Sequence, residues 1–174
     1  VTAQGLAPLG VPVLDGGTRD CVVRHSRAVG LPGTLPDIEG LAIRLEGQDG
    51  GDLLLAGTGS GILTRYALVP RRRDGVCSTL LPMRTPTGAV LLRASPAPAD
   101  NATWHLSWAR PAGTWHTFGR LTLHADAGPP SPFDPINGLP TGLSQYDVVA
   151  RLRNPAYIRA AMQRSSPAGS PHHA

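Results

Sequence analysis

The chain has 174 residues, which is enough for one domain with a substantial core but too few for two large domains. Glycine (21) and proline (18) are frequent, while 41% of residues are hydrophobic and 16% charged, which excludes a fully disordered chain and a continuous membrane span. The 16 basic residues are all arginines and lie scattered among 12 acidic ones, so a nucleic-acid binder is the least supported class. The composition predicts a compact, turn-rich β domain.

The first part of the chain predicts strands after an irregular start. Residues 1–19 carry glycine and proline without a regular period, so we expect an irregular lead-in. Alternating apolar residues predict strands over 21–26 and 41–45. The continuous apolar run 52–56 is typical of a strand buried on both faces.

A short helix is predicted next, over 62–69, with Leu63, Ala67 and Leu68 on one side. Pro70 and the arginines that follow it end this helix. Three more strands are predicted after it, over residues 76–81, 89–93 and 103–109.

A hairpin is predicted around the turn at 110–113, with a return strand over 115–124. Strict alternation along the return strand predicts two opposite faces, with Phe118, Arg120 and Thr122 on one and Leu121 and Leu123 on the other.

The end of the chain predicts an extended connector over 133–142 and then a helix that begins at Ser144 and is kinked or restarted at Pro155. The predicted domain covers residues 20–165, and 166–174 form a small, polar tail. Strands followed by one late helix predict an α+β fold.

The two cysteines, Cys21 and Cys77, lie in apolar strand-like segments, and we expect reduced, mostly buried thiols rather than a disulfide. The first 15 residues lack the charged and apolar regions of a signal peptide, so we expect a cytoplasmic protein without membrane contact.

The candidate chemistry lies on the late helix, where Arg153, Tyr157 and Arg164 are spaced to share one stripe. A tyrosine normally ionises near pH 10, and a neighbouring guanidinium together with a ferric ion would let it bind iron as an anion. The pattern alone is also compatible with a basic, solvated helix face.

The longest motif near this stripe is Phe-Asp-Pro-Ile-Asn-Gly-Leu-Pro-Thr-Gly, over residues 133–142, and it resembles the segment before the proximal helix in the catalase family. Without a gap, the family's Arg-x-x-x-Tyr then falls on Arg153 and Tyr157, and its following arginine on Arg164. Four further segments are similar to catalase motifs in the same order: 23–26, 37–45, 52–58 and 119–123.

The resemblance covers roughly residues 20–165 and implies an antiparallel β-barrel of the catalase type, followed by a helix that carries the haem ligand. It implies haem b as cofactor, Tyr157 as the axial iron ligand and Arg153 as the group that keeps Tyr157 ionised. Arg24 and Arg164 would pair with the haem propionates, and Ser26 lies on the same strand face as Arg24. His25 points the other way, so we do not expect it to act as a catalytic base.

The family's distal histidine has no counterpart in this sequence, and Ala56 stands where the family has its distal asparagine. Splitting a peroxide O–O bond quickly needs such a base and such a polar group. We therefore expect haem binding with weak peroxidase or hydroperoxide-reducing activity on a small peroxide, and no full catalase activity.

The alternative is a non-catalytic barrel, either a haem carrier or sensor or a degenerate domain that binds another small apolar ligand. Catalases bury large areas in tetramer contacts, so the resemblance also implies a homo-oligomer. No nucleic-acid or membrane partner is expected.

Two other sequence features have simpler interpretations. The glycine-rich segment 57–61 lacks the lysine or acidic partner of a phosphate-binding loop, so turn glycines are favoured. The three arginines at 71–73 have no interleaved aromatic residues, which favours a solvated loop over a phosphate contact.

Overall fold

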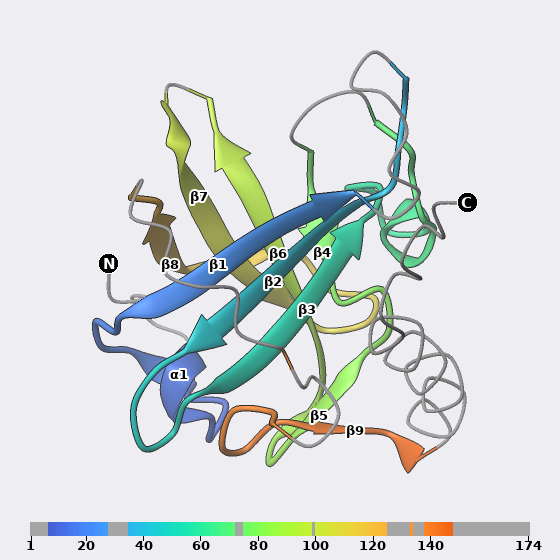
Figure 1. Ribbon diagram of the computed structural model, residues 1–174. Coiled ribbons are helices and arrows are strands. Elements are labelled where there is room, and N and C mark those ends of the chain that lie inside the picture. Colours follow the sequence, from blue (N-terminus) through green and yellow to red (C-terminus); the bar gives the residue numbers. More distant parts are fainter. Residues whose placement is uncertain are drawn as a thin grey trace, which may run out of the picture.

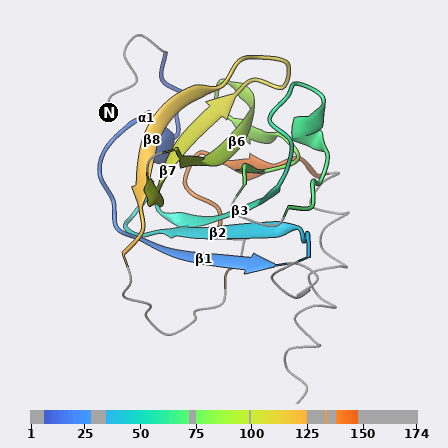
Figure 2. The same cartoon turned by 90° about the horizontal axis from the view of Figure 1, so that it is seen from above.

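A computed structural model describes residues 7–27, 35–71, 75–98, 100–124, 133 and 138–147. These residues form a strongly curled, antiparallel β-sheet (Figure 1). Strands β1, β2, β3, β4 and β6 follow one another across the sheet. Strand β6 also pairs with β7, which pairs with β8, and with β5, which pairs with β9. Seen from above, β1–β3 form one wall of the curl and β6–β8 the opposite wall (Figure 2).

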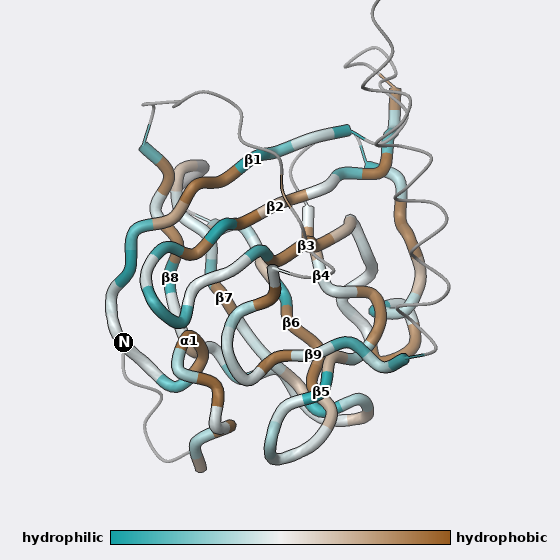
Figure 3. The backbone as a smooth tube through the Cα atoms, turned by 60° about the horizontal axis from the view of Figure 1, so that its bottom comes forward, coloured by the Kyte–Doolittle hydropathy of each residue, from teal (hydrophilic) through white to brown (hydrophobic). Residues whose placement is uncertain are grey.

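The wall of β1 (Cys21–Arg27), β2 (Glu39–Leu45) and β3 (Gly51–Gly57) confirms the three strands predicted in the first part of the chain. Val23 pairs with Ile43, which pairs with Leu53, so apolar residues of successive strands share the inner face. Hydrophobic and hydrophilic stretches therefore alternate along this wall (Figure 3). The prediction that β3 is buried on both faces is only partly right, because Leu54 and Ala56 on its outer face are half-buried.

The opposite wall contains β6 (Gly88–Ala97), β7 (Asp100–Ala109) and β8 (His116–Thr122). The predicted hairpin turn is confirmed, since the Gly113 N–H donates to the Arg110 carbonyl at 2.9 Å. The predicted faces of β8 are wrong at one residue. A β-bulge opposite Leu106 and Ser107 adds Phe118 to the strand, so Phe118 turns inward against the core as Leu121 does.

Short elements complete the sheet and its lower end. The short strand β4 (Cys77–Ser78) pairs with β3 and β6 and so joins the two walls, while β5 (Met83–Thr85) and β9 (Ser144–Gln145) extend the sheet beyond β6. The 3₁₀ turn η1 (Thr64–Tyr66) lies between β3 and β4 in the chain. The helix α1 (Pro12–Asp15) places Leu14 in the core. The Asp15 carboxylate accepts the N–H groups of Leu9 (2.7 Å) and Val11 (2.9 Å), and this ties the segment before α1 to it.

The predicted fold class, an α+β catalase-type barrel with a C-terminal haem-ligand helix, is wrong. Among the described strands, β1 pairs only with β2 and β8 only with β7, so the sheet is a half-barrel and does not close. The only α-helix in the described part is α1, in a segment that was expected to be irregular. Ser144 lies in β9 and pairs with Arg84 of β5 instead of starting a helix, because this pairing provides backbone partners for the edge of β5.

Two smaller expectations also change. The helix predicted over 62–69 is reduced to η1, and Leu63 (84% exposed) and Leu68 (47% exposed) point to solvent. The strand predicted over 76–81 is reduced to β4, beyond which Leu80 adopts a positive φ of 61°. Both cysteines are free thiols as predicted, with Cys77 buried and Cys21 half-buried.

Candidate functional site

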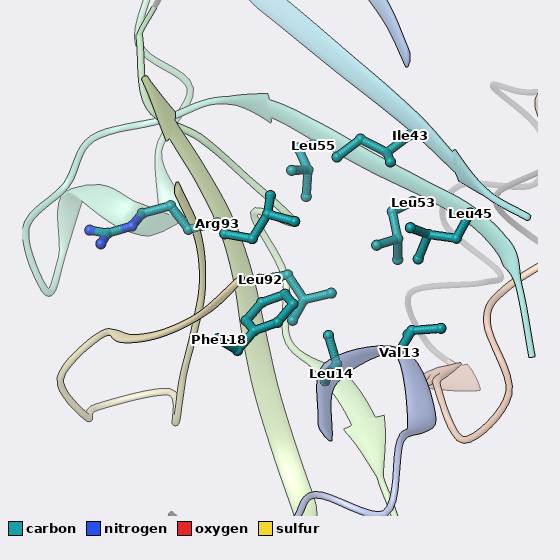
Figure 4. Close-up of a pocket in the computed structure, with 10 residues that line it drawn as sticks. Val13, Leu14, Ile43, Leu45, Leu53, Leu55, Leu92, Arg93 and Phe118 are labelled. Atoms are coloured by element: carbon teal, nitrogen blue, oxygen red, sulfur yellow. The ribbon is translucent and has the colours of Figure 1, made fainter. Parts of the chain in front are cut away.

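The interior of the curl is core rather than a ligand pocket. Its cavity measures about 40 Å³, well below the roughly 150 Å³ that holds a benzene molecule. Figure 4 shows leucines of β2, β3 and β6 pointing into it, with α1 closing one end. A haem or a lipid does not fit there.

The outer face of β1–β3 carries several small residues beside the larger Arg24 and Leu54. Ser26, Gly40 and Ala56 form one cross-strand row, and Ala42 lies in the next row beside Arg24; we call these four small residues the shelf. A Cβ atom at Gly40 would lie 2.8 Å from the Ser26 hydroxyl oxygen, so a larger residue there would require the Ser26 side chain to rotate. Ser26 is exposed, Gly40 and Ala56 are half-buried and Ala42 is buried, so the row of Ser26, Gly40 and Ala56 is the part of the shelf that a ligand can reach.

Two arginines and an aromatic ring border the shelf. The guanidinium carbons of Arg24 and Arg44 lie 5.0 Å and 4.9 Å from the centre of the Phe133 ring. The Phe133 ring thus lies next to both cations.

The two arginines differ in their partners. Arg44 forms a bidentate ion pair with the buried Asp52, with Nε and Nη2 donating to the two carboxylate oxygens at 2.7 Å each. These hydrogen bonds raise the pKa of Arg44. Arg24 is exposed, and no carboxylate in the described part of the chain contacts it. Arg24 is therefore the cation at the shelf that can pair with an incoming carboxylate.

The structure describes only some of the residues of the predicted site. Arg24 and Ser26 are both exposed on the outer face of β1, on the same side as predicted. Arg153, Tyr157 and Arg164 lie outside the described residues. His25 faces the opposite side, where its ring meets the Trp104 ring edge-on at 6.3 Å, which agrees with its exclusion as a base at this face.

Sequence reasoning missed the contribution of Arg44 and Phe133. Arg44 alternates with Ile43 and Leu45 in the predicted strand 41–45, so the sequence already places it on the outer face. The stacking of Phe133 on both arginines depends on how a distant connector returns to the sheet, which no local pattern encodes.

The described residues contain no group of three or more histidine, cysteine, aspartate or glutamate side chains arranged to hold a metal ion. They also include no helix that is long and apolar enough to cross a membrane. No family model, curated protein or solved structure matches the chain.

Proposed function

We propose that this protein binds haem b on the outer face of β1–β3, with Tyr157 as the iron ligand. The observation that carries the proposal is the shelf, a row of small residues beside the exposed cation of Arg24, which no carboxylate among the described residues contacts. A haem is planar and carries two propionates, so it needs a flat contact surface and a cationic fork. The residues on this face fit both needs.

Each residue has a separate task in this proposal. Arg24 would bind a propionate, and Ser26 and Gly40 would leave room for the ring. The ligand set carried by the sequence resemblance adds Arg153, which would hold Tyr157 ionised, and Arg164, which would bind the second propionate. Haem would supply a redox-active iron that can react with peroxides.

Binding is better supported than rapid catalysis. Fast peroxide cleavage needs an acid–base group above the ring. On the described part of the outer face, Asp52 is engaged by Arg44, and His25 lies on the other face. We therefore propose a haem-binding protein with at most slow hydroperoxide reduction, which would make a haem carrier or sensor role the main alternative to an enzyme.

The test is a titration of the purified apo-protein with haemin, followed by visible spectroscopy. We expect saturable binding with a ferric tyrosinate spectrum, which Tyr157→Phe abolishes. Arg24→Gln should keep that spectrum but weaken binding roughly fivefold, as expected for about 1 kcal/mol. Arg120→Gln, at an exposed arginine of β8, is the matched control and should bind as the wild type does.

Absence of saturable binding, or binding that is equal in the wild type and both site variants, would refute the proposal. If haem binds as expected, peroxide turnover by the loaded protein separates a slow peroxidase from a carrier.

A further inference from the structure

A second arginine cluster lies on the opposite wall, around the ring of Trp115. The guanidinium carbons of Arg65 and Arg93 lie 4.8 Å and 4.4 Å from the centre of this ring. Arg65 comes from η1 and Arg93 from β6, so two distant segments bring two like charges to one aromatic side chain.

Arg65 has a structural role in this cluster. It is only 2% exposed, and its guanidinium donates to the carbonyls of Gly61 (Nε, 3.4 Å) and Gly113 (Nη1, 3.0 Å). The neighbouring Tyr66 hydroxyl donates to the Pro111 carbonyl at 2.5 Å. These bonds fasten the η1 segment to the β7–β8 turn and hold the positive charge of Arg65 in place.

Arg93 has no such role. It is half-buried, and no described residue accepts a hydrogen bond from its guanidinium. Burial and the nearby charge of Arg65 both lower the pKa of Arg93. In Figure 4 its guanidinium points away from the leucines of the core, on the outer side of β6.

The cluster contains more donors than acceptors. Arg93 Nε and Trp115 Nε1 are both buried without a hydrogen-bond partner in the described structure, and both can only donate. No carboxylate among the described residues forms an ion pair with Arg65 or Arg93. Leaving two buried donors without a hydrogen-bond partner is costly, and a bound group that accepts hydrogen bonds from both would relieve that cost.

The surroundings of Arg93 suit a small polar group. Arg93 pairs across the sheet with Ser78 on one side and Ser107 on the other, and both serines are fully buried. The Ser107 and Thr117 hydroxyl oxygens lie 3.3 Å apart and continue this polar row. The Ser78 hydroxyl already donates to the Arg65 carbonyl, so the Ser107–Thr117 side of Arg93 is where hydroxyls can help to bind phosphate or carboxylate oxygens.

We propose that Arg93, supported by the fixed charge of Arg65 and the indole N–H of Trp115, binds a small oxyanion, either inorganic phosphate or the carboxylate of a small acid. This site is separate from the shelf, so it does not depend on haem binding.

The experiment is a titration of the full chain with phosphate, and in a second arm with acetate, against sodium chloride at matched ionic strength. The readouts are the indole N–H resonance of Trp115, assigned with Trp115→Phe, and the melting temperature. We expect one arm to give a saturable shift of this resonance and a rise in melting temperature, because a ligand that binds only the folded state stabilises it. The arm that responds identifies the oxyanion.

The matched variants are Arg93→Gln, which keeps the side-chain length but removes the charge, and the control Arg120→Gln. We expect Arg93→Gln to weaken binding at least tenfold and Arg120→Gln to leave it unchanged. If Arg93→Gln does not fold, the wild-type titration still decides. A wild-type response no larger than that to chloride, or equal affinity in Arg93→Gln, would overturn the proposal.

Discussion

The two faces of β1–β3 are made from alternate residues of the same three strands, yet they have opposite properties. The inner face buries Leu41, Ile43, Leu53 and Leu55 almost completely. The outer face carries the four small residues of the shelf and the arginines beside it. The inner face therefore stabilises the fold, whereas Arg24 and Ser26 on the outer face are exposed and can contact a ligand.

The largest expected effect comes from Leu55→Ala on the inner face. Leu55 is 4% exposed, and its truncation enlarges a cavity in a packed core, so we expect a loss of about 3 kcal/mol in the free energy of unfolding. Its neighbour Leu54 is half-buried on the outer face, and Leu54→Ala should cost about 1 kcal/mol or less. Urea unfolding of both variants makes the comparison, and equal losses would contradict the division between the faces.

A smaller effect is expected when the ion pair on the outer face is broken. Asp52 is buried, and Asp52→Asn leaves Arg44 without its charged partner, so we expect a loss of about 2 kcal/mol. Glu46→Gln removes an exposed carboxylate from the turn after β2 and should change stability by less than about 0.5 kcal/mol. Urea unfolding at pH 7 distinguishes the two variants. If Asp52→Asn leaves the free energy of unfolding unchanged, the ion pair serves only to position Arg44.

Arg24→Gln should affect binding without affecting stability. Arg24 is exposed and has no ion-pair partner in the described structure, so we expect the free energy of unfolding to change by less than about 0.5 kcal/mol. The same variant is the one expected to weaken haem binding. A large loss of stability would mean that Arg24 holds the fold together and is not available to a ligand.

The smallest effect concerns Cys21, at the half-buried end of the inner face. Burial is the main cause that raises the pKa of the Cys21 thiol, and the negative charges of Asp20 and Glu46 raise this pKa further. A raised pKa means less thiolate at a given pH, so alkylation by iodoacetamide should accelerate only at a higher pH than for an unperturbed cysteine peptide. Mass spectrometry after alkylation across pH 7 to 10 checks this, and an unshifted profile would show that the thiol is solvated.

The sequence by itself determined the local elements of β1, β2, β3 and β7 and the hairpin that leads to β8, because alternation of apolar residues and turn chemistry act over a few neighbouring positions. It also placed Arg24 and Ser26 together on one face, since the side-chain period of a strand fixes that relation.

Only the tertiary structure decided the rest. It replaced the expected catalase-type barrel with an open, curled sheet, turned Phe118 inward through a bulge and paired Ser144 with a strand edge. It also brought Arg24 and Arg44 to the Phe133 ring. In the same way, it brought Arg65 and Arg93 to the Trp115 ring. The physical reason is that these contacts join residues far apart in the chain, where long-range pairing and packing outweigh local preference.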